Sequence, residues 1–335
     1  MKKGIFALAA VVALAACSQE DVIVADKGAA IGFDTFVENS TRSVDDPSFT
    51  NDENKMFSDF AVYGYVNGAV LLDGVRVAKE DLEEDQKTTG WEYEGTQYWI
   101  AGANYNFNAV APLTNGGWTK TAATKDATTL SFTNNGITDL LYAYATDEGK
   151  VEGNEAVAFT FRHTLSKVKF SFENAYNATN ATIKVRDVKI TDAYATGNVV
   201  LTNATDWSTQ SGELELAFGN AVAEDATSID ALAFAYNTTL ESYNELFMIP
   251  GAGPTVVDGK KTYTVTFIVD LLVSGTVVKS YGHSINAAFT PEAGNSYNLT
   301  ATINAENIDP EHKQEPIEFT VNTLPGWGTT NNQNI

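Results

Sequence analysis

The chain has 335 residues, of which 44% are hydrophobic, so it can bury a sizeable core, and chains of this length usually form about two domains. It carries 43 acidic and 21 basic residues, which gives a formal net charge of −22. A negative field of this size repels phosphate backbones, which argues against nucleic acid as a partner.

The N-terminus has the layout of a cleavable export signal. Lys2 and Lys3 precede an unbroken apolar stretch from Ile5 to Ala16, which is shorter than the ~18 apolar residues of a membrane-spanning helix. We therefore assign residues 1–16 to a signal peptide that is removed on export. No other stretch of the sequence approaches the apolar length of a membrane span.

The end of this signal contains Cys17, the only cysteine of the chain. The sequence Leu14-Ala15-Ala16-Cys17 resembles the bacterial lipobox, which implies that Cys17 is acylated and becomes the first residue of a lipoprotein. More than one acyl chain gives stable membrane anchoring. Ser18-Gln19-Glu20-Asp21 resembles the acidic tag that sends lipoproteins of Bacteroides-type bacteria to the outer face of the outer membrane. The alternatives are a signal-peptide cysteine without a role and an acidic linker exposed to solvent.

Short stretches of alternating polarity between turn residues predict β-strands throughout the rest of the chain. Asn67-Gly68 predicts a hairpin and Asp73-Gly74 a further turn, while 77–87 is read as a charged surface loop. A first series of strands is predicted at 60–65, 69–72, 98–100, 105–111, 128–132 and 140–145. A second series is predicted at 157–161, 168–172, 183–190, 198–201, 213–218, 263–269, 276–280, 297–303 and 317–321.

This spacing predicts an all-β protein with two tandem antiparallel β-sandwiches. We place the first at 43–157 and the second at 158–335, after an N-terminal segment at 17–42 that follows the signal peptide. Residues 167–172 alternate in polarity, so their strand should have one face on the core and one in water.

Residues that could support catalysis or bind a metal are sparse. His163, His283 and His312 are isolated in sequence, and no G-x-S-x-G motif is present. We therefore expect no enzyme, no metal site and no cofactor, with a surface hydrolase as a minor alternative. The acidic stretch between Asp45 and Asn54 could hold calcium, but it matches no EF-hand spacing and is better explained as a solvated loop.

Seven segments follow one another in a characteristic order: 31–33 leading to Thr41-Arg42, 60–65, 105–112, 139–143, 161–170, 246–250 and a closing strand from Ile317 to Trp327. Read in this order, they resemble the fimbrillin family of Bacteroides-type bacteria, whose members are protease-assembled pilus subunits. The resemblance implies two tandem transthyretin-like sandwiches and export as a lipidated precursor to the outer membrane. It also implies cleavage after an arginine by a trypsin-like protease, loss of the N-terminal strand, and insertion of a strand from another subunit into the groove. Partners would be fimbrial subunits in a homo- or heteropolymer and, for a tip subunit, a host or bacterial surface ligand.

The residues allow these roles to be placed. Asn39 to Ser43 is small and polar, so cleavage is expected between Arg42 and Ser43, although an ordinary surface arginine is the alternative. Ile31, Phe33, Thr35 and Val37 share one face of an extended segment just upstream, which makes this segment the candidate displaced strand.

The candidate donor strand repeats the pattern with Ile317, Phe319 and Val321. The alternative is that this strand closes its own second sandwich.

A rival function from another class is a glycan-binding surface lipoprotein that does not polymerise. Trp91, Tyr93, Tyr98 and Trp99 are close enough in sequence to form an exposed aromatic platform. They also alternate as core positions do, which favours burial instead.

Overall fold

The structure, a computed structural model, describes residues 29–37, 57–78, 91–148, 156–202, 205–223, 226–308 and 317–324. Regular structure in these ranges is β-strand apart from one short helix, α1 (Ala305–Ile308). The all-β sandwich class predicted from the sequence is therefore confirmed. No helix within the described ranges has the length and apolar character that a membrane span requires.

The first sheet has seven strands, all paired antiparallel except for β1 and β9, which run parallel. Its order is β1 (Phe33–Val37), β9 (Val157–His163), β8 (Leu141–Glu148), β5 (Asn104–Ala111), β2 (Asp59–Val66), β3 (Ala69–Ala78) and β4 (Glu92–Tyr93). The chain thus returns from residue 157 to place a late strand beside the earliest described one.

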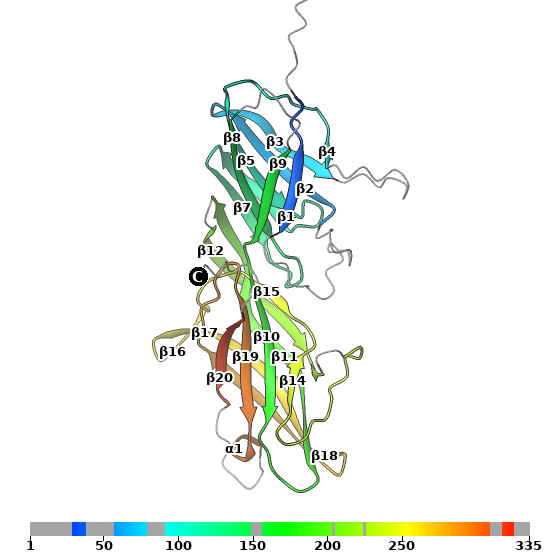
Figure 1. Cartoon of the computed structure of the whole chain (residues 1–335). Helices are drawn as coiled ribbons and strands as arrows, with labels where there is room; N and C mark the ends of the chain where they lie inside the picture. Colours follow the sequence, from blue (N-terminus) through cyan, green and yellow to red (C-terminus); the bar gives the residue numbers. More distant parts are fainter. Residues whose placement is uncertain are drawn as a thin grey trace, which may run out of the picture.

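The second and third sheets enclose a common core in the lower part of the molecule, and the third sheet also extends into the upper part (Figure 1). The second contains β13 (Ala221–Val222), β14 (Thr239–Ser242), β10 (Ser166–Asn174), β19 (Ser296–Ile303) and β20 (Phe319–Leu324), with β15 (Leu246–Met248) also paired to β10. The third contains β16 (Thr255–Val257), β17 (Lys260–Val273), β11 (Ala181–Leu201), β7 (Ala127–Thr133) and β6 (Trp118–Thr124), with β12 (Thr205–Gly219) on β11 and β18 (Thr276–Ala287) on β17.

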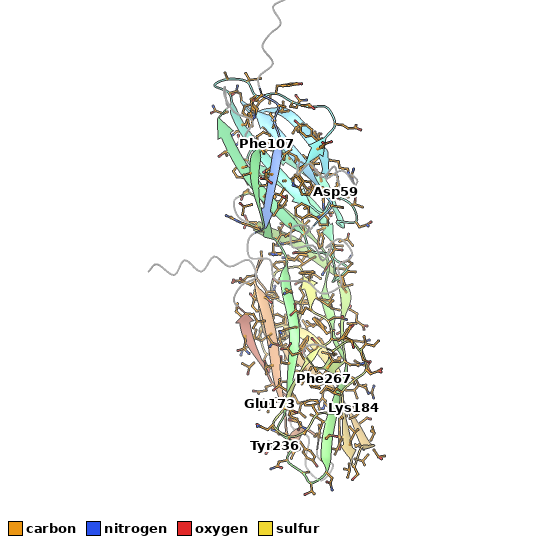
Figure 2. The ribbon with its side chains drawn as sticks, turned by 45° about the vertical axis from the view of Figure 1, so that its right-hand side comes forward. Asp59, Phe107, Glu173, Lys184, Tyr236 and Phe267 are labelled. Atoms are coloured by element: carbon orange, nitrogen blue, oxygen red, sulfur yellow. The ribbon has the colours of Figure 1, made fainter. Side chains whose placement is uncertain are left out.

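Three clusters of buried apolar side chains hold the sheets together. The first core contains Ile31, Phe107 and Phe159, and the second contains Phe170 and Phe267. Figure 2 shows Phe107 among the side chains of the upper part and Phe267 among those of the lower part. A third cluster joins residues of β2 and β7 to residues of β11 and β15, so apolar packing continues between the two parts.

Strand β11 connects the two parts through the backbone as well. It has 21 residues, pairs with β17 over its first half and with β7 over its second, and aligns Val199 with Leu130. Strand β7, which we predicted as part of the first sandwich at 43–157, therefore belongs to the third sheet, as does β6, which we did not predict. Strand β9, through which the predicted boundary at 157 and 158 passes, lies wholly in the first sheet. The division into two domains remains a prediction.

One prediction about the second sheet is wrong. Strand β10 does not have a solvent-facing side, because Lys167 and Ser171 are 5% and 3% exposed. The Lys167 Nζ is 2.8 Å from a Glu245 carboxylate oxygen, so a buried ammonium is paired there. Strands β14, β15 and β19 flank β10, which places it at the centre of its sheet.

Candidate functional site

The candidate displaced strand consists of β1 and the two residues before it, and its buried side chains belong to the first core. Ile31 and Phe33 are only 1% and 4% exposed, and Thr35 on the same face is half-buried. Val37 is the last residue of β1, but its side chain lies outside what the structure describes. The alternation therefore correctly identifies an extended segment with one buried face.

One side of β1 is paired with β9. The parallel register aligns Phe33 with Val157 and Val37 with Phe161. Just before the strand, the Val157 amide donates to the carbonyl of Gly32 at 2.8 Å.

The other side of β1 is covered by residues 91–99, which we call the 91–99 segment. The Ile31 amide donates to the Gln97 carbonyl at 2.9 Å, and the Trp99 amide donates to the Ala29 carbonyl at 3.0 Å. Isolated bridges also link Phe33 with Trp91 and Ala30 with Tyr98. Strand β1 is therefore inserted between two neighbours, and it joins the β9 end of the first sheet to the β4 end.

The ring of Phe33 lies among three other aromatic rings. Its centroid is 5.3 Å from that of Tyr93, 5.6 Å from Phe159 and 5.9 Å from Phe107, with stacked, tilted and edge-on geometries represented. These separations are typical of favourable aromatic pairs. The three surrounding rings thus favour an aromatic side chain at position 33.

Two side-chain hydrogen bonds connect the 91–99 segment to β1. The Tyr93 hydroxyl donates to the Ile31 carbonyl at 2.9 Å and accepts the Gln97 amide at 3.0 Å. Burial raises the pKa of Tyr93, so the hydroxyl stays protonated at neutral pH and can donate. The Trp91 indole Nε1 donates to the Thr35 hydroxyl at 3.0 Å.

The aromatic residues of this segment do not form an exposed platform. Trp91 and Trp99 are 8% and 3% exposed, Tyr93 is half-buried, and only Tyr98 is open to solvent at 38%. Residues 98–100, predicted as a strand, form one bridge to Ala30 and no strand. The alternation of Trp91 and Tyr93 correctly indicated burial, but no local pattern indicated that this segment covers β1.

The candidate donor strand lies in β20 and just before it, at the edge of the second sheet. It pairs antiparallel with β19 and aligns Val321 with Leu299. Ile317 is 2% exposed, and the Phe319 ring lies 5.4 Å from Phe170 and 6.0 Å from Phe267. Within this chain the strand thus packs on the second core, as in the alternative reading.

Several other predicted positions lie outside the described residues. They are Cys17, Arg42, Ser43, His312 and the acidic stretch from Asp45 to Asn54. His163 is buried against the Asp139 carboxylate, and His283 stacks on Phe267 at 5.1 Å. Among the residues that the structure describes, no group of three or more His, Cys, Asp or Glu side chains is placed to hold a metal.

Comparison with known proteins gives both fold relatives and a family. A candidate cell adhesion protein of Bacteroides eggerthii, 16% identical, matches over 90% of this chain and 97% of its own with a TM-score of 0.50, which shows a shared fold. A candidate cell adhesion protein of Bacteroides uniformis (15% identity, 88% and 97% coverage, TM-score 0.47) is also similar. So is the fimbrial anchor protein Mfa2 of Porphyromonas gingivalis (10% identity, 89% and 98% coverage, TM-score 0.39). No curated protein matches. The fimbrillin-like family matches residues 41–323, and the chain therefore belongs to this family.

Proposed function

We propose that the protein is a cell-surface fimbrial subunit or adhesin that joins other subunits by strand exchange. In this proposal it is exported as a lipoprotein through Cys17, held at the outer membrane, and cut between Arg42 and Ser43 by a trypsin-like protease. Membership of the fimbrillin-like family supports the fimbrial role. The same membership supports a role in binding and assembly with no catalysis.

The observation that carries the proposal is the position of β1. Residues 31–37, which include β1, supply Ile31 and Phe33 to the first core, yet the last of them, Val37, is only five positions before Arg42 (42 − 37 = 5). A cut after Arg42 would leave β1 attached to the rest of the protein by noncovalent contacts alone. The family match begins at residue 41, beyond β1, so the strand lies outside the matched residues.

Loss of β1 would leave a site that favours another strand. Burying Ile31 and Phe33 contributes on the order of 1.5 to 3 kcal/mol for each side chain, and this is lost when they leave. The backbone groups of β9 and of the 91–99 segment that now bond to β1 would also lose their partners. A strand from another subunit with matching side chains would restore both.

A protease experiment tests the proposal. The full chain is treated with an arginine-specific protease, and the products are followed by mass spectrometry and size-exclusion chromatography. The other three arginines, Arg76, Arg162 and Arg186, lie within strands β3, β9 and β11, which protects them from cleavage. We expect one cut after Arg42, followed by oligomers or, with a second fimbrial subunit present, mixed oligomers.

The matched control is Arg42→Ala, which should remain uncut and monomeric. Complete cutting of the wild-type chain with only monomers afterwards, both alone and with other subunits, would show that the cut does not open a strand site. Equal cutting of the Arg42→Ala chain would remove this arginine from the mechanism.

A further inference from the structure

We propose that the site held by β1 selects its ligand by three side chains. It accepts an extended peptide segment with an aliphatic residue, an aromatic residue and a hydroxyl-bearing residue at alternate positions, matching Ile31, Phe33 and Thr35. This inference rests on the proposed function, since it specifies which strand of a partner the site would take. The ligand runs parallel to β9 and antiparallel to the 91–99 segment, as β1 does.

The first position requires an aliphatic side chain. Ile31 is 1% exposed and packs in the first core. Its amide is bonded to the Gln97 carbonyl, and its carbonyl accepts the Tyr93 hydroxyl. The backbone of an incoming strand is therefore fixed at this residue, and its side chain must enter an apolar environment.

The second position requires an aromatic ring. Phe33 is 4% exposed and has Tyr93, Phe107 and Phe159 around it, with ring centroids between 5.3 and 5.9 Å away. An aliphatic side chain would lose the aromatic pair geometry and leave part of the volume unfilled.

The third position requires a hydrogen-bond acceptor. Trp91 is 8% exposed, and its indole N–H donates to the Thr35 hydroxyl. Indole can only donate, so an aliphatic residue in place of Thr35 removes this hydrogen bond from a buried group. Thr or Ser satisfies the position, whereas Val, which has nearly the shape of Thr, does not.

This requirement discriminates between partners. The candidate donor of this chain carries Ile317 and Phe319 at the first two positions but Val321 at the third. A second copy of this chain would therefore match two of the three positions. The site favours a strand from a different protein that has Thr or Ser there, which points to a heterologous partner.

Peptide competition on the cut full chain tests the inference. After cleavage at Arg42, the protein is equilibrated with a fluorescent peptide of residues 29–37, and bound label is measured after size exclusion. Unlabelled peptides then compete: the natural sequence, Thr35→Ser and Thr35→Val. We expect the Ser peptide to compete as the natural one does, and the Val peptide to compete about tenfold less well.

The matched protein variant is Trp91→Phe, which keeps an aromatic ring and removes the donor. In this variant the natural and Val peptides should compete equally, because the hydrogen bond between residue 91 and the Thr35 hydroxyl has lost its donor. The comparison of Ser with Val peptides on the wild-type protein stands even where the Trp91→Phe chain does not fold.

Equal competition by the Thr and Val peptides on the wild-type protein would overturn the inference, and so would a preference that persists in Trp91→Phe. Oligomers formed without any preference for Thr would refute the inference and leave the proposed function standing. Absence of both peptide exchange and oligomers would refute the proposed function itself.

Discussion

Phe33 of β1 stacks on Phe159 of β9, with ring centroids 5.6 Å apart and ring planes 13° from parallel. The two residues are 126 positions apart (159 − 33 = 126) and belong to the single parallel pair of the first sheet. The contact links an N-terminal strand to the middle of the chain, so removing either ring should lower the stability of the whole first core.

The first prediction concerns Phe33→Ala in the uncut protein. Truncating a buried Phe typically costs 3 to 5 kcal/mol, roughly, because of lost transfer free energy and the cavity left behind. We expect a lower denaturation midpoint of the first core, followed by chemical unfolding with tryptophan fluorescence, since Trp91 and Trp99 belong to that core. The neighbouring Asp34→Ser is an exposed control and should change little. An unchanged midpoint for Phe33→Ala would mean that β1 does not stabilise the fold.

The second prediction separates the two readings of the C-terminal strand. Phe319 contacts Phe170, Phe172 and Phe267, so Phe319→Asp places a carboxylate against the second core and should lower the melting temperature of the uncut monomer. Thr320→Asp, on the exposed face of the same strand, serves as the control. A normal melting temperature together with lost oligomer formation would instead assign the strand to donation.

The third prediction concerns attachment. Cys17→Ala should abolish acylation and release the protein from the membrane fraction, because the lipid is the proposed anchor. Val22→Ala lies beyond both the cysteine and the acidic tag and should leave the distribution unchanged. The measurement is cell fractionation with mass spectrometry of the mature N-terminus, and an unchanged amount of Cys17→Ala at the outer membrane would contradict lipidation.

The fourth prediction is a pH dependence that arises from Asp59. Burial raises the pKa of this carboxyl, but hydrogen bonds from the Thr114 amide and hydroxyl and from Arg76 outweigh it, so the pKa lies below its ordinary value of 3.8. A depressed folded-state pKa stabilises the fold above the unfolded-state value, and that stability is lost as the pH falls through the folded-state value.

The free energy of unfolding should therefore decrease below about pH 4. In Asp59→Asn it should be lower than in the wild type at pH 7, and it should decrease less on acidification. Urea unfolding between pH 7 and pH 2.5 measures both effects. Parallel pH profiles for wild type and Asp59→Asn would show that another group is responsible.

Local patterns were enough to predict many of the strands. Asn67-Gly68 forms the predicted hairpin turn between β2 and β3, and both residues adopt positive φ, which few other residues tolerate. Alternation also identified β1 and its buried face before any partner was known. These features depend on the nearest neighbours in sequence, which is why the sequence alone contains them.

The sequence could not distinguish turns from bulges. Asp73-Gly74 was predicted to be a turn, yet Gly74 is an extra residue at a register shift within β3, opposite Val62 and Tyr63. The two strands predicted at 183–190 and 198–201 are one strand, β11, with register shifts near Asp192 and Gly197. A glycine or a short polar residue fits either structure, and the partner strand decides.

Burial and pairing by segments distant in sequence could not be predicted from the sequence either. Neither the burial of Lys167 beside Glu245 nor the pairing of residues 91–99 with β1 follows from local pattern, because both require segments more than 50 positions away. For the candidate site, the sequence predicted β1 but not its contacts with the 91–99 segment.

The parallel pairing of β1 with β9 also has a consequence for how the protein folds. Ile31 and Phe33 are synthesised before their neighbours, and β9 follows more than 120 residues later. Both β9 and the 91–99 segment must be in place before β1 can be enclosed. Contacts this distant in sequence form slowly, because the long intervening loop must close. We therefore expect β1 to insert late in folding, into a sheet whose other six strands pair with one another without it. Until that step, a newly made chain would expose the apolar side chains of Ile31 and Phe33, and such exposure favours aggregation.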